Sequence, residues 1–73
     1  MKRNWLEDIR KQRGMTQQEV ADKSGMTRPH YTMIEIGARD PSVSVAMKIA
    51  KTLGFRWTKF FEEKGNGSKQ LVN

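Results

Sequence analysis

The chain has 73 residues, a net charge of +6 and no cysteine. This length suits one small domain, and the lack of thiols excludes disulfides and thiolate metal sites and fits a reducing cytoplasm. The apolar runs are far shorter than the roughly 20 residues that cross a bilayer, and no apolar signal segment follows the basic first residues. We therefore expect no membrane contact, and the basic balance favours a polyanion such as nucleic acid as the partner.

The first predicted helix starts with a capping-box pattern. Asn4 is followed three residues later by Glu7, the spacing at which two side chains satisfy backbone N–H groups at a helix start. Apolar residues then recur at helical spacing until Gly14, where the chain can turn. The pattern predicts a helix between these residues.

A second helix, at about residues 17–24, has the same type of start. Thr16 and Glu19 form another capping-box pair, and Gly25 follows the helix at a position that favours a left-handed residue. Ala21 supplies a small side chain where a neighbouring helix can cross closely. These residues predict a short helix followed by a tight turn.

The third predicted helix has two possible cap residues at its start. Thr27 is a good cap, and Pro29 is tolerated in the first turn because its missing N–H has no partner there. Since the residue before a proline avoids helical angles, Arg28 is the alternative cap. Two residues on this helix, Tyr31 and Ile34, are expected to face inward, and the helix ends before Gly37.

A fourth helix begins after the turn residues 40–42, and Gly54 ends it. Its apolar stripe comprises Val43, Ala46, Met47, Ile49, Ala50 and Leu53. A fifth helix is predicted over residues 57–63, and the polar, glycine-rich residues 64–73 are predicted to be a disordered tail. No strand alternation or repeat is present, so we expect one all-α domain over residues 1–63.

Two helices joined by a glycine-bearing turn, over about residues 16–36, match the pattern of a helix-turn-helix. Such pairs also occur in ordinary helical bundles, but linked motifs along the chain add to this one. They are Ile9-Arg10, Arg13-Gly14, Thr16-Gln17-Gln18-Glu19-Val20-Ala21, Gly25-Met26-Thr27-Arg28, Ile34-Glu35 with Gly37, Arg39 and Pro41-Ser42, and Lys48-Ile49-Ala50-Lys51 with Leu53-Gly54. With these motifs the chain resembles the phage-repressor and Cro type of helix-turn-helix proteins, the XRE family.

The resemblance implies a compact, five-helix, lambda-repressor-like fold whose third helix enters the major groove. It also implies a sequence-specific transcriptional regulator that binds double-stranded operator DNA. Because no second domain is evident that would bind an inducer or recruit polymerase, we expect a repressor on a palindromic operator. The alternative is an antitoxin-type interaction protein that binds a partner protein and regulates its own promoter.

The resemblance assigns two sets of DNA contacts on and beside the third helix. The residues expected at base edges are Arg28, Pro29, Thr32 and Met33, and those expected at phosphates are Gln17, Thr27, His30, Tyr31 and Arg39. An arginine can bond guanine O6 and N7 together, whereas proline, methionine and a threonine methyl can pack on thymine methyls. Arg28 has two alternative roles, as a solvated helix-start residue or as a non-specific phosphate contact.

Two of these residues carry further expectations. Tyr31 stands where the family has an aliphatic residue, so we expect its ring inside and its hydroxyl directed outward to a phosphate. His30 is the only histidine, and a lone imidazole cannot complete a metal site. No metal is therefore expected.

Family positions also pair Arg10 with Glu35 as a structural ion pair between the first and third helices. If the pair is buried, it orients the third helix, and removing one partner destabilises the fold strongly. The alternative is a surface pair of little energetic value.

Three aromatic residues near the end of the domain, Trp57, Phe60 and Phe61, have two interpretations. A small domain needs large apolar side chains in its core. The resemblance instead implies that part of this cluster lies at the interface of a homodimer, which would hold two recognition helices one DNA turn apart.

We expect no enzymatic activity, cofactor or small-molecule ligand. The carboxylate pairs Glu7-Asp8 and Glu62-Glu63 are adjacent in sequence, so their side chains diverge on a helix, and no nucleophile-base set or phosphate-binding glycine loop is apparent. A bacterial or phage-encoded protein of this kind is expected in the cytoplasm, associated with the nucleoid.

Overall fold

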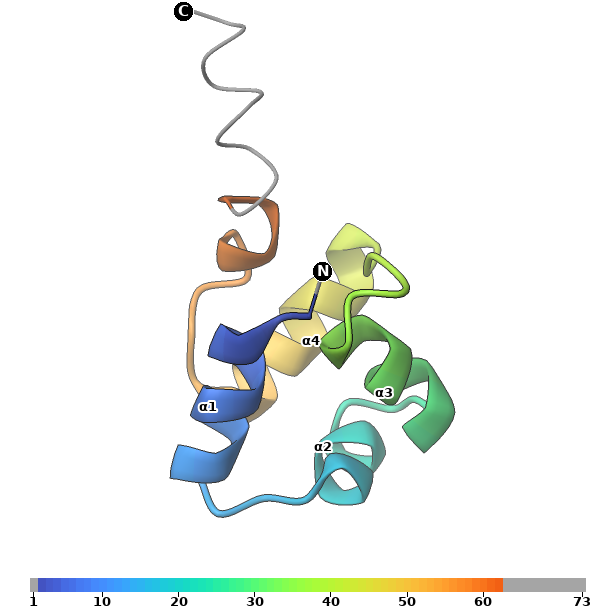
Figure 1. Cartoon of the computed structure of the whole chain (residues 1–73), viewed down its shortest axis with the longest axis vertical. Coiled ribbons are helices and arrows are strands. Elements are labelled where there is room, and N and C mark those ends of the chain that lie inside the picture. Colours follow the sequence, from blue (N-terminus) through green and yellow to red (C-terminus); the bar gives the residue numbers. More distant parts are fainter. Residues whose placement is uncertain (1, 63–73) are drawn as a thin grey trace, which may run out of the picture.

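Helices are the only regular elements in the computed structural model, which describes residues 2–62 (Figure 1). They are α1 (Asn4–Gln12), α2 (Gln17–Lys23), α3 (Arg28–Glu35), α4 (Val43–Leu53) and a short fifth helix over residues 59–62. The prediction of an all-α fold with five helices is confirmed. Residue 63 and the predicted tail over residues 64–73 lie outside the described residues.

Threonine caps start α2 and α3, the two helices predicted to form the helix-turn-helix. At α2 the Thr16 hydroxyl accepts a hydrogen bond from the backbone N–H of Glu19 at 3.1 Å, and the Glu19 carboxylate accepts one from the Thr16 N–H at 2.8 Å. At α3 the Thr27 hydroxyl accepts from the N–H of His30 at 3.3 Å. Thr27, and not Arg28, is therefore the cap of α3.

The capping box predicted for α1 is wrong. Arg3 is the residue before the helix, Asn4 is already helical, and no side chain caps the start. The carboxylate of Glu7 instead lies 3.0 Å from the Lys2 amine and 3.3 Å from the Lys11 amine. Hydrogen bonds from these two amines lower the pKa of Glu7.

The structure corrects two details of the predicted helices. Ser24 follows α2 as its cap residue and is not part of the helix, and Gly25 then turns the chain with a φ of 72°. On α4, Val43 and Met47 belong to the predicted inward stripe, yet about half of each side chain is exposed. Helical geometry places both at one edge of the stripe, so α4 buries a narrower face than its periodicity indicated.

One core joins all five helices. Its buried members are Leu6, Val20, Ala21, Tyr31, Ile34, Ala46, Ile49, Leu53 and Phe60. Figure 1 shows α2 and α3 side by side, joined by a short turn, with α4 farther back between α1 and α3, where it packs against α2. Ala21 is fully buried, which agrees with the need for a small residue where these helices meet. No helix among residues 2–62 is long and apolar enough to cross a membrane.

Candidate nucleic-acid interface

The four side chains expected at base edges share one surface on the outer side of α3. Arg28, Pro29, Thr32 and Met33 line a single open hollow. Arg28, Pro29 and Met33 are exposed, whereas Thr32 is half-buried. They occupy positions 1, 2, 5 and 6 of α3. Helical geometry brings residues at this spacing together on one side of the helix, as the sequence predicts.

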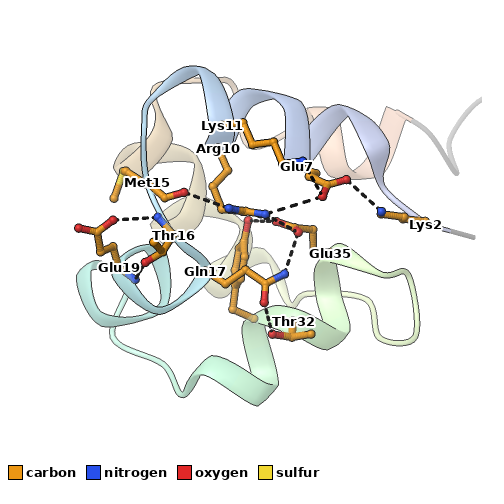
Figure 2. A network of polar contacts seen from close by, with 11 residues as sticks. Lys2, Glu7, Arg10, Lys11, Met15, Thr16, Gln17, Glu19, Thr32 and Glu35 are labelled. Carbon is orange, nitrogen blue, oxygen red and sulfur yellow. Dashed lines mark hydrogen bonds and ion pairs between the residues drawn. The ribbon is translucent and has the colours of Figure 1, made fainter.

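The inner side of α3 is tied to α1 and α2 through the carboxylate of Glu35 (Figure 2). Arg10 donates to it twice, from Nε to Oε2 at 2.9 Å and from Nη2 to Oε1 at 3.1 Å. The Tyr31 hydroxyl donates to Oε2 at 2.7 Å, and the Gln17 amide donates to Oε1 at 2.9 Å. The ion pair expected between Arg10 and Glu35 is thus formed, and both side chains are buried.

These hydrogen bonds decide the charge of the buried carboxylate. Burial alone would raise the pKa of Glu35, but the bonds from Arg10, Tyr31 and Gln17 outweigh burial and lower it. The bond to Glu35 raises the pKa of Arg10. Both members of the pair therefore stay charged at neutral pH, and an ionised carboxylate can only accept hydrogen bonds.

The phosphate contact expected from Tyr31 is wrong. Its side chain is fully buried, and its hydroxyl donates to Glu35 inside the protein. Burial and the neighbouring carboxylate raise the pKa of Tyr31 well above its usual range. The sequence predicted the inward ring correctly, but the nearest strong acceptor for the hydroxyl is the buried carboxylate one helical turn away.

Gln17, expected at a phosphate, bridges α2 and α3. While its amide nitrogen donates to Glu35, its amide oxygen accepts from the Thr32 hydroxyl at 2.8 Å. Figure 2 shows the two bonds leaving opposite ends of the same amide. Since the NH₂ group carries two hydrogens, one remains for a phosphate.

The other candidate phosphate contacts lie at the two ends of α3. Thr27 caps its start and is exposed, and His30 follows in the first turn, half-buried. Arg39 is exposed in the segment after α3, where its backbone N–H donates to the Met33 carbonyl at 3.2 Å. Residues at both ends of a groove-reading helix are well placed to meet the phosphates on either side of a groove.

Sequence reasoning missed Arg3, which anchors the segment after α3. Its side chain is buried and donates to the Ile34 carbonyl at 2.6 Å, to the Arg39 carbonyl at 3.2 Å and to the Asp40 carboxylate at 2.8 Å. No local pattern marks this arginine, because its partners lie 31 to 37 residues away in sequence. Arg3 thereby positions the backbone that carries Arg39.

Phe60, one of three aromatic residues expected at a dimer interface, lies in the core of the domain instead. It is 1% exposed, and its ring centroid lies 5.1 Å from that of Trp5 and 5.6 Å from that of Phe55. A side chain enclosed by its own domain offers no surface to a second copy, so Phe60 is not an interface residue. Trp57 and Phe61 are half-buried and contact each other edge to face, with centroids 5.8 Å apart.

Comparison with known proteins identifies the family. The family model described as "Helix-turn-helix" matches residues 6–60, most of the described part of the chain. The chain belongs to the XRE family of helix-turn-helix transcriptional regulators. The resemblance inferred from the motifs is therefore confirmed, and the matched residues include α2 and α3, which the sequence predicts to be the helix-turn-helix.

Relatives of this XRE-family chain carry the same description. It is 51% identical over 69 residues to the HTH-type transcriptional regulator YqaF of Bacillus subtilis (strain 168), covering 94% of this chain and 91% of YqaF. It is 46% identical to YqaE of the same organism over 66% of this chain and 41% of YqaE. It is 34% identical to the HTH-type transcriptional regulator PuuR of Escherichia coli (strain K12) over 80% of this chain and 31% of PuuR. No solved structure matches the chain.

No metal site accompanies the interface of this regulator in the part that the structure describes. Residues 2–62 contain no group of three or more histidine, cysteine, aspartate or glutamate side chains placed to hold an ion. They also contain no buried side-chain nitrogen or oxygen without a hydrogen-bond partner. The polar groups beneath α3 are therefore satisfied by one another.

Proposed function

We propose that this XRE-family regulator binds a specific duplex sequence through the outer face of α3 and represses transcription by occupying the promoter. The proposal rests on the contrast between the two faces of α3, one fixed inside the protein and the other exposed. Its inner face is held by the buried bonds of Glu35, while Arg28, Pro29, Thr32 and Met33 form one accessible hollow. A rigid helix with a clustered outer face suits direct reading of base edges in the major groove.

Phosphate contacts fix the orientation of such a helix on the duplex. We assign them to Gln17, Thr27, His30 and Arg39, which lie at the start of α2 and at both ends of α3. The net charge of +6 supports binding to a polyanion. A regulator with this partner acts in the cytoplasm, at the nucleoid.

The regulator is proposed to act as a homodimer on a palindromic operator. A groove next to the end of α4 supports this assembly. It is lined by the apolar residues Met47, Ala50, Phe55 and Trp57, together with Lys48, Lys51, Arg56 and Thr58. Met47 is 49% exposed, so a second copy would remove apolar surface from water. A two-fold dimer would set the two α3 helices about 34 to 36 Å apart, one turn of DNA.

Selection of bound sequences from random duplex DNA tests the proposal. We expect an enriched palindrome, and Arg28→Ala should relax the preference at one base pair of each half-site by about 1 to 3 kcal/mol. Lys23→Ala is the control, because it removes a positive charge from an exposed residue that lies outside both the hollow on α3 and the groove next to α4.

Each failure of this selection has a distinct meaning. An unchanged preference for Arg28→Ala would remove the base contact. The absence of any duplex binding in dilute buffer, together with recovery of one stoichiometric protein partner, would replace the regulator by the antitoxin-type alternative.

A further inference from the structure

The hydroxyl proton of Thr32 takes part in a hydrogen bond within the protein. Glu35 is ionised and accepts from the Gln17 amide nitrogen at 2.9 Å, so this end of the amide must be the NH₂ group. The amide oxygen then faces Thr32 at 2.8 Å. Because an amide oxygen cannot donate, the Thr32 hydroxyl has to be the donor.

This hydrogen bond limits which base edges Thr32 can contact in a major groove. A threonine hydroxyl has one hydrogen, so Thr32 cannot also donate to the O6 or N7 of guanine or to the O4 of thymine. Guanine offers only acceptors at its major-groove edge, whereas thymine adds a 5-methyl group. Guanine and thymine present no N–H donor at that edge, so toward these two bases the group of Thr32 that remains is its methyl, whereas its oxygen can still accept from adenine N6–H or cytosine N4–H.

The surroundings of Thr32 suit an apolar contact. Pro29 and Met33 lie beside it in the hollow on α3. Neither side chain has a hydrogen-bond donor, and Met33 is 39% exposed. Together with the Thr32 methyl they form an apolar surface large enough to pack on one methyl group.

We propose that Gln17 is a positioning residue that holds Thr32 with its methyl outward, and that Thr32, Pro29 and Met33 recognise the 5-methyl group of a thymine. The inference rests on the proposed function, since it requires α3 to lie in the major groove. It adds the chemistry that is read at one position of the operator half-site, and it gives Gln17 a role in base selection besides its phosphate contact.

Replacement of single thymines by deoxyuridine in the selected operator tests the inference, because this change removes only the 5-methyl group. Fluorescence anisotropy would give the dissociation constant of the full chain for each duplex. At one thymine of each half-site we expect affinity to fall about fourfold, the effect of losing one buried methyl-sized contact. If no thymine responds while sequence-specific binding persists, the inference is wrong and the proposed function stands.

Two variants of Thr32 separate its methyl from its hydroxyl. Thr32→Val keeps a methyl and should retain the preference for thymine over uracil at that position. Thr32→Ser keeps the donor to Gln17 and should lose the preference. The ratio of two duplex affinities is taken within one variant, so any loss of folding stability cancels. A full thymine preference in Thr32→Ser would overturn the role of the methyl.

A third variant tests the positioning role of Gln17. In Gln17→Leu the Thr32 hydroxyl is free to rotate and can donate to guanine O6 or N7 or to thymine O4, so the methyl is no longer held outward and the preference for thymine over uracil at that position should fall. A merely structural or phosphate-binding Gln17 would weaken all sequences alike and leave this preference unchanged, which would overturn the positioning role. If the wild-type chain bound no duplex specifically, the proposed function and this inference would fall together.

Discussion

Glu35 shows how one buried side chain sets the position of a whole helix. It is 1% exposed, and it receives bonds from Arg10 on α1, Tyr31 on α3 and Gln17 on α2. Arg10 also donates to the Met15 carbonyl at 3.0 Å, in the connection between α1 and α2. A surface ion pair contributes about 0 to 1 kcal/mol, but breaking a buried pair leaves a buried charge without the opposite charge that compensates it.

Loss of Arg10 is therefore expected to destabilise the fold strongly. Arg10→Met should lower the free energy of unfolding by about 3 to 5 kcal/mol, measured by urea denaturation. Lys48→Met, which removes an exposed charge on α4, is the control and should change the stability by less than about 0.5 kcal/mol. Equal unfolding midpoints for the two variants would contradict the structural role of the pair.

The same carboxylate makes stability depend on pH. The pKa of Glu35 is lower in the folded chain than its ordinary value of 4.5, so the unfolded chain binds the proton more readily. The stabilisation is present above that ordinary value and is lost as the pH falls through the folded pKa.

Urea midpoints measured from about pH 7 down to about pH 3 should thus decline more for the wild-type chain than for Glu35→Gln. The comparison removes the contributions of the other carboxyl groups, including Glu7. Identical pH profiles would show that Glu35 does not titrate differently on folding.

At the scale of elements, α3 is too short to be helical by itself. A segment of eight residues lies below the length of about 12 to 15 residues at which isolated helices become marginally stable. Its start is stabilised by the Thr27 cap and by a proline in the first turn. Its inner side is buried through Tyr31, Ile34 and Glu35. The side chains on the outer side therefore contribute little to folding. This arrangement suits a helix that recognises DNA, because the outer side chains can differ between proteins without a loss of stability.

Removal of the α3 cap should weaken both folding and DNA binding. Thr27→Ala is expected to cost about 0.5 to 2 kcal/mol of stability, measured by thermal unfolding, because the backbone N–H of His30 loses its partner. Thr27→Ser retains the hydroxyl and should stay close to the wild type. The cap would be irrelevant if the alanine and serine variants unfolded at the same temperature.

At the scale of the whole molecule, the proposed DNA-reading face and the proposed dimer surface lie in separate places. The hollow on α3 and the groove beside α4 share no lining residue. In Figure 1 the fifth helix lies toward the opposite end of the described chain from α2. The two activities can therefore be changed independently by substitution.

Dimerisation is expected to fail in Met47→Lys, because the change sets a charge among the apolar residues of the groove in each copy. Multi-angle light scattering, with the mass of the duplex subtracted, should report twice the monomer mass for the wild-type chain on its operator and the monomer mass for this variant, with unchanged folding by circular dichroism. Val43→Lys, at an exposed apolar residue of α4 outside the groove, is the control that should leave the mass unchanged. A wild-type chain that is monomeric both free and on DNA would refute the dimer.

Binding should also weaken steeply with salt. The logarithm of the binding constant is expected to fall linearly with the logarithm of the salt concentration, because neutralised phosphates release counterions. Arg39→Gln should reduce the magnitude of that slope by about one and leave the sequence preference unchanged. A salt-independent affinity would contradict phosphate contacts altogether.

Local sequence was sufficient for the helices, the turn between α2 and α3, and the family. Thr16 and Thr27 cap α2 and α3 because their hydroxyls reach backbone groups only three residues away. The outer face of α3 was also predictable, since helical geometry places residues three and four apart on the same side. The same local reasoning failed at Asn4, where the contacts of the preceding residue determine how the chain enters α1.

Tertiary structure alone decided which groups the polar and aromatic side chains contact. The Tyr31 hydroxyl and the Gln17 amide were both expected at phosphates, and both donate to the carboxylate of Glu35. Phe60 lies in the core and not at an interface, and Arg3 holds a segment more than 30 residues away. Hydrogen bonds and burial depend on atoms that folding brings together, so periodicity shows which face a residue occupies but not the partner it meets there.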